Sequence, residues 1–149
     1  MEKSKDLWGE LETNPQITNP YTILKAQAKY LGNKTKNVIE AYVEAMEGKK
    51  VMQRKKLLPD SKLNSLGKAE LPKSYIFGCT FYIVAPFLNN FTSSLLSVYY
   101  NQDGFPCALE YKREVFEISD QEHFEKELLR IFSSGETQKL IQILIAQSS

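Results

Sequence analysis

The run from Tyr75 to Ala85 is the densest stretch of β-branched and aromatic residues in the chain, and it constrains the fold most. Such a run is typical of a central strand that is covered on both faces of a sheet. A second apolar run spans Leu95 to Tyr100, and after a turn at residues 101–104 the chain alternates strictly from Phe105 to Tyr111. These residues predict an antiparallel meander of three or four strands over residues 75–118.

Two details of this meander leave alternatives open. Pro106 has no N–H to donate to a ladder, which places its strand at an edge of the sheet or requires a bulge there. Beyond Lys112 and Arg113 the alternation shifts by one residue, to Phe116 and Ile118. A one-residue shift of phase indicates either a bulge or a new short strand.

The region before the sheet has the spacing of an amphipathic helix. Asn19 and Pro20 are a good N-cap and first helical residue. From Leu24 to Ala45 apolar residues recur at intervals of three and four, so we expect one long helix over residues 18–47, packed across the sheet. The alternative is a break at Gly32 and Asn33, because Gly-Asn can end a helix with a left-handed residue.

The rest of the chain frames this body as one domain, residues 1–149, of the α+β class. Residues 1–17 form an arm that we expect to pin Trp8 onto the domain, and residues 48–74 form a basic linker. Residues 119–149 predict two helices, of which the first begins with a capping box at Ser119 and Glu122 and ends at Gly135. The last helix is apolar most of the way round, which predicts deep burial or an interface.

Charge distribution gives one alternative function, nucleic-acid binding. The formal net charge of the chain is only +1, but residues 49–73 hold eight basic residues against two acidic ones, a local +6. A phosphate-binding segment is therefore an alternative, since neutralised phosphates release counterions. No aromatic residue interleaves this cluster to stack on bases. The cluster consists of Lys49, Lys50, Arg54, Lys55 and Lys56.

Catalytic chemistry has few candidates. The chain has no phosphate-binding loop, nucleophile elbow or zinc-protease motif. A thiol enzyme would need Cys79 or Cys107 beside His123, the only histidine. One histidine and scattered carboxylates give no ligand spacing for a metal, and no pattern indicates a cofactor.

The sequence also indicates where the protein works. No run approaches the roughly 18 apolar residues that span a bilayer, so we expect no membrane association. The charged N-terminus lacks the apolar core of a signal peptide, and the two cysteines form no paired motif. We expect a cytoplasmic protein.

We therefore expect a non-catalytic module that binds a protein partner or itself, including as a homodimer. The expectation rests on the missing catalytic constellation and on the apolar last helix. Aromatic residues on a sheet can also anchor a partner. The candidate contact residues are Ile141, Ile145, Tyr99 and Tyr100.

Overall fold

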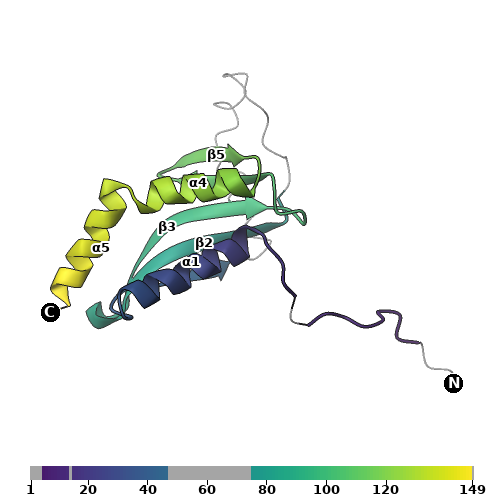
Figure 1. The fold of residues 1–149 in the computed structure, drawn as a ribbon, viewed down its shortest axis with the longest axis horizontal. Helices are drawn as coiled ribbons and strands as arrows, with labels where there is room; N and C mark the ends of the chain where they lie inside the picture. The colour runs from purple at the N-terminus through teal and green to yellow at the C-terminus, as the bar shows by residue number, and fades with distance from the viewer. Residues whose placement is uncertain (1–4, 14, 47–74, 149) are drawn as a thin grey trace, which may run out of the picture.

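The computed structural model describes residues 5–13, 15–46 and 75–148, and it confirms an α+β fold (Figure 1). One antiparallel sheet has the order β1-β2-β3-β4-β5, so strands adjacent in sequence are adjacent in space. The strands are β1 (Glu40–Ala45), β2 (Phe77–Ala85), β3 (Phe91–Tyr100), β4 (Cys107–Tyr111) and β5 (Glu114–Ile118). The helices are α1 (Pro20–Lys34), α4 (Gln121–Phe132) and α5 (Gly135–Gln147), with a short 3-10 turn, η1 (Pro86–Leu88).

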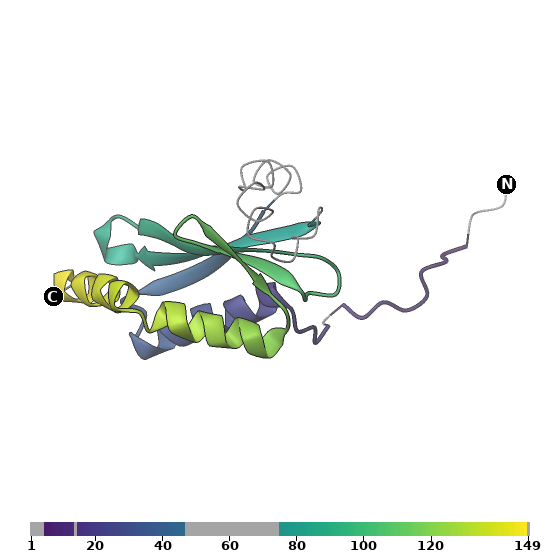
Figure 2. The same cartoon turned by 90° about the horizontal axis from the view of Figure 1, so that it is seen from above.

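Both α1 and α4 lie on the same face of the sheet (Figure 2). α1 covers β1 and β2, while α4 lies toward β5. The core fills the space between, where Leu24 of α1 and Phe124 of α4 are completely buried against alternate residues of the strands. We call this the helix-covered face. Among the described residues no helix lies on the opposite face, which carries Tyr42, Thr80 and Tyr99.

The prediction of one long helix over residues 18–47 was wrong, and the alternative of a break near Gly32 was right. α1 ends at Lys34, and Lys36 and Asn37 both adopt left-handed backbone angles (φ 52° and 65°). The Asn37 N–H donates to the Gly32 carbonyl at 2.8 Å, which satisfies an end carbonyl of the helix. The chain then reverses into β1, so the sheet has five strands instead of the predicted three or four.

The residues of β1 were predicted as helix because their apolar positions fit both a helical and a strand periodicity. Tyr42 and Ala45 continue the three-and-four spacing of α1, but the aliphatic residues Ile39, Ala41, Val43 and Ala45 also recur at every second position. Ile39, Ala41 and Val43 belong to the helix-covered core, whereas Tyr42 projects from the other face. The turn at Lys36 and Asn37 selects the strand, because a helix cannot continue through two left-handed residues.

The C-terminal half follows the sequence prediction more closely. The phase shift at Lys112 and Arg113 is a new strand, since both residues are left-handed (φ 51° and 66°) and turn β4 directly into β5. Pro106 comes just before β4, which is an inner strand, so it lies neither on an edge strand nor in a bulge of β4. The register shift that does occur lies in β2, between Phe81 and Tyr82.

Two helix boundaries differ from the prediction. The N-cap of α4 is Asp120, whose carboxylate accepts from the His123 N–H at 2.8 Å, so the expected capping box at Ser119 does not form. α4 ends at Phe132, and Gly135 begins α5 behind the N-cap Ser134 instead of ending α4. The short connection lets α5 turn away from α4 toward the end of the sheet (Figure 1).

The N-terminal arm, which is residues 5–18 without residue 14, does not pin Trp8 onto the domain as expected. Every residue of the arm is exposed, and Trp8 shows 78 % of its surface to solvent. The arm runs away from the body in both views (Figures 1 and 2). It meets the body at Asn19, where the side chain caps α1 by accepting from the Thr22 N–H at 2.9 Å.

Candidate protein-interaction groove

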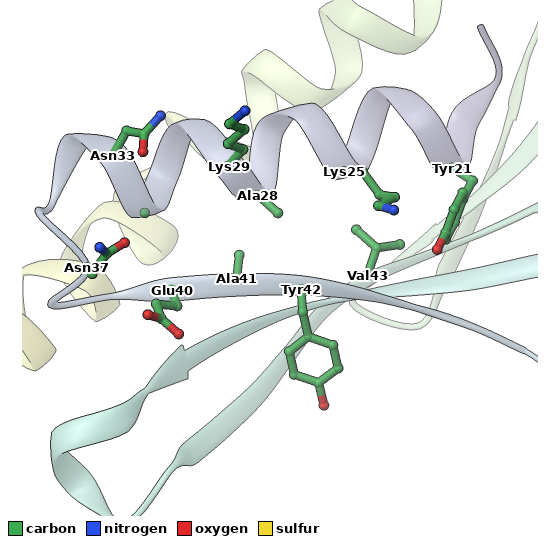
Figure 3. Close-up of a pocket in the computed structure, with 11 residues that line it drawn as sticks. Tyr21, Lys25, Ala28, Lys29, Asn33, Asn37, Glu40, Ala41, Tyr42 and Val43 are labelled. Carbon is green, nitrogen blue, oxygen red and sulfur yellow. The ribbon is translucent and has the colours of Figure 1, made fainter. Parts of the chain in front are cut away.

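A groove lies between α1 and β1, at one edge of the sheet (Figure 3). Its volume is about 460 Å³, within the range of small-ligand and peptide pockets. Small residues form its floor: Ala28 of α1 points toward Ala41 of β1, and Val43 also points toward the helix. The full lining is Tyr21, Lys25, Ala28, Lys29, Gly32, Asn33, Asn37, Glu40, Ala41, Tyr42 and Val43.

The local sequence explains why the groove stays open. Ala28 and Gly32 leave only small side chains on the side of the helix that lines the groove, and Ala41 does so on the strand. A Cβ added to Gly32 would meet the Asn37 side-chain oxygen at 3.2 Å, so a larger residue there would crowd the turn. With large side chains at these positions the helix and the strand would fill the space between them.

The helical wall of the groove is cationic. Lys25 and Lys29 are one turn apart on α1 and both line the groove. The Lys25 ammonium lies over the Tyr21 ring, 5.4 Å from its centre, which holds this cation at one end of the wall. α1 contains three lysines and no acidic residue, so its own charges leave these cations uncompensated. Glu40 is the acidic residue of the lining, and its side chain points away from α1 (Figure 3).

The strand wall carries backbone groups that point away from the sheet. The Met46 N–H donates to the Gly78 carbonyl of β2 at 2.8 Å, which shows which residues of β1 direct their backbone groups toward β2. Inward and outward residues alternate in an antiparallel pair, so Tyr42 and Glu44 face β2 while Ala41 and Val43 direct their N–H and C=O groups outward. Among residues 5–13, 15–46 and 75–148, no strand pairs with this outer edge.

An aromatic ring borders the groove on the opposite side of β1. Tyr42 points away from α1 and stacks on Tyr82, with the ring centres 4.9 Å apart and the planes 18° from parallel. Tyr42 nevertheless shows 44 % of its surface. A chain laid along β1 would therefore meet a cationic wall on one side and an exposed ring on the other.

The predicted contact residues divide into two groups. Tyr99 and Tyr100 are only 2 % and 8 % exposed, so they offer a partner almost no surface. On α5, Ile141 packs partly against the core, and Ile145 is 38 % exposed beside Ile143 at 45 %. α5 is therefore not fully buried, although Leu144 anchors it to the core.

The basic cluster of residues 49–56 lies outside the described residues. The structure thus tests neither the phosphate-binding hypothesis nor the positions of Lys49, Lys50, Arg54, Lys55 and Lys56, and that hypothesis stays a prediction.

The thiols occupy the interior of the sheet. Cys79 in β2 and Cys107 in β4 are both fully buried and free. Burial raises the pKa of each thiol to about 12, so both are protonated at neutral pH and poorly nucleophilic. The His123 ring lies instead beside Ser119, whose backbone N–H donates to its Nδ1 at 3.2 Å. Nothing in this arrangement favours thiol catalysis over packing.

Other types of site find no support in the part of the chain that the structure describes. There, no three His, Cys, Asp or Glu side chains come together in a group that could hold a metal ion. No helix of these residues has both the length and the apolar character needed to cross a bilayer.

Sequence reasoning missed the groove because it joined the two walls into one helix. The signal was present in the aliphatic residues at every second position from Ile39 to Ala45 and in the Lys-Asn pair at positions 36–37. The chain matches no family model, and neither curated proteins nor solved structures gave a significant match.

Proposed function

We propose that the protein is a non-catalytic protein-interaction module that binds an extended segment of a partner protein as an added strand beside β1. The observation that carries this proposal is the groove, in which an edge strand with outward backbone groups lies opposite a helix. Peptide recognition by strand addition uses such an edge, since main-chain hydrogen bonds give affinity and neighbouring pockets select alternate side chains. Two free thiols support a reducing compartment, and we propose the cytoplasm.

Exposed backbone groups are the physical reason for this choice. An unpaired sheet edge presents donors and acceptors to any extended chain, and natural proteins usually block it with charged residues, proline or a covering element. Along β1 the residues that point toward α1 are Ala41 and Val43, which carry no charge, while Glu40 of the lining points away from α1. The lysines stand across the groove on α1, where they can pair with side chains of a bound strand without obstructing it.

The test is a nuclear magnetic resonance titration of the ¹⁵N-labelled protein with a synthetic peptide of alternating glutamate and valine. We expect the largest shifts at the amides of Ala41 and Val43 and smaller ones along α1 at Lys25 and Lys29. The matched control is the same peptide with N-methyl groups on alternate residues, which removes the donors of one edge. Shifts that map elsewhere, or equal binding of the methylated peptide, contradict strand addition.

Self-association through α5 is the second candidate. The exposure of Ile143 and Ile145 on a helix otherwise anchored by Leu144 favours it. Substituting lysine for Ile145 would then abolish a dimer without unfolding the protein, because this side chain is 38 % exposed. A dimer that survives Ile145→Lys and Ile143→Lys contradicts this candidate.

A further inference from the structure

The N-terminal arm carries apolar side chains that nothing in its own body buries. Leu7, Trp8 and Leu11 show 89 %, 78 % and 65 % of their surfaces. Three large apolar residues within five positions, each at least 65 % exposed, form a concentration of apolar surface that is typical of an interaction site. The arm holds no regular structure that would explain them, and it leads away from the sheet (Figures 1 and 2).

The charge of the arm is opposite to that of the helical wall of the groove, where Lys25 and Lys29 stand, whereas Glu40 of the strand wall points away from α1. Residues 6–12 hold three acidic side chains and no basic one, whereas α1 holds three lysines and no acid. A segment that is both acidic and apolar is therefore the kind of ligand that a lysine-bearing helical wall beside an unpaired strand edge would select. The same chain contains both the groove and an arm of this chemistry.

We propose that the occupant of the groove is the N-terminal arm of a second copy of this chain, so that two copies exchange arms. The inference rests on the proposed function, because it names the segment that adds to β1. In an exchanged dimer each copy donates one arm and accepts one, which satisfies both grooves in a closed two-fold arrangement.

Strand alternation fixes which side chains face the groove. In an extended arm Asp6, Trp8 and Glu10 share one face, and Leu7 and Leu11 share the other. With the first set toward α1, the carboxylates face Lys25 and Lys29, and the indole enters the space of about 460 Å³. Leu7 and Leu11 then lie on the side of β1 where the Tyr42 ring is exposed. Both faces of the arm thus meet complementary surfaces.

The direction of the arm favours a second copy over the arm's own groove. The arm leaves the body at Asn19, which lies against the Gly104 turn between β3 and β4. From there it runs away from the body, so it would have to reverse direction to reach β1 of the same chain (Figure 2). A partner's arm needs no such reversal.

The experiment uses the full-length protein and its one tryptophan, Trp8, as an internal reporter. Sedimentation velocity and tryptophan emission are followed over a range of protein concentrations. We expect the monomer-to-dimer transition and a blue shift of the emission to occur at the same concentrations. The double variant K25E/K29E should weaken the dimer by about tenfold or more, since it sets like charges against each other.

A charge exchange makes the test specific to the two surfaces. The variant D6K/E10K should also fail to dimerise alone, because a basic arm meets a basic groove. Mixed with K25E/K29E it should form a heterodimer, in which each arm again meets a groove of opposite charge. The matched control is K139E, which reverses an exposed lysine on α5 and should leave the dimer unchanged.

Several results would overturn the proposal. A protein that stays monomeric, or a blue shift that does not depend on concentration, would show that no second copy fills the groove. A dimer lost in Ile145→Lys but kept in K25E/K29E would place the interface on α5. Shifts at Ala41 and Val43 on adding the glutamate–valine peptide to a monomeric protein would keep the proposed function and remove only the arm as its natural occupant. If neither peptide nor arm binds, both inferences fail.

Discussion

The two edges of the sheet differ in the side-chain contacts that they make with the neighbouring helices. At β5, the Arg130 guanidinium of α4 lies over the Phe116 ring, 5.6 Å from its centre, and is held there by Glu127 at 2.9 Å. Lys112, in the turn before β5, pairs with Glu136 of α5 at 2.6 Å. At β1, within the part of the chain that the structure describes, no ion pair joins the lysines of α1 to the strand, and a groove lies between them.

Both strands, β1 and β5, are edge strands among the described residues, so the difference lies in the side-chain contacts that the helices make beside them. Charged side chains that bridge helix and strand cover the β5 side at little cost, because each keeps its charge near water. On the β1 side the lysines of α1 lie across the groove from Ala41 and Val43 of the strand. The following predictions test this contrast, beginning with the largest expected effect.

Phe124→Ala should destabilise the protein by about 3–5 kcal/mol, since the ring is completely buried beneath the β5 side and contacts Phe105. Urea unfolding followed by circular dichroism measures the loss. Leu24→Ala, at the equally buried position on the β1 side, is the matched variant and should cost about 2–5 kcal/mol. A cost below about 1 kcal/mol for either would mean that the corresponding helix does not form part of the core.

Tyr42→Pro and Val43→Pro should separate the two sides of β1. The Tyr42 N–H faces β2 and its ring stacks on Tyr82, so its loss should cost about 2–4 kcal/mol. The Val43 N–H faces outward, so Val43→Pro should cost only about 1 kcal/mol while removing a donor to an added strand. Thermal unfolding and the peptide titration together check this pair. Equal destabilisation by both prolines would contradict the assigned phase of β1.

Arg130→Gln should have the smallest effect, about 1 kcal/mol or less, because the guanidinium and its ion pair are half-exposed. The same variant should leave peptide binding at β1 unchanged, as measured by the titration described above. Lys126→Gln, which removes a longer and more exposed pair with Glu122, is the control and should be nearly silent. A change at Ala41 or Val43 on substituting Arg130 would show that the two edges are coupled.

The sequence predicted the parts of the fold in which one periodicity dominates. The meander could be derived because residues 75–85 and 95–100 are β-branched and aromatic runs and residues 105–111 alternate, with turn residues between them. The C-terminal helices could be derived from their caps and apolar stripes. β1 could not, because its apolar positions continue a helical register and also alternate, and the choice depends on the backbone of Lys36 and Asn37. Pairing with β2, which is distant in sequence, then stabilises the strand.

The candidate site was less accessible than the fold. A groove between a helix and a strand exists only once the two are separate elements, so an error at one turn concealed it. The prediction that the arm packs onto its own domain was wrong for a different reason. Leu7, Trp8 and Leu11 suggested anchors, but sequence pattern does not say whether the surface that receives an anchor belongs to the same chain.

The order of the strands also has a kinetic consequence. β2 to β5 are joined by short connections, so their contacts are local and should form early. β1 pairs with β2 between residues as far apart in sequence as Glu40 and Val84, and bringing such distant residues together adds an entropic cost. We therefore expect β1 to join the sheet last and to open first. In amide hydrogen exchange the inward N–H groups of Tyr42 and Glu44 should lose protection before those of β3, even while the remainder of the sheet stays folded.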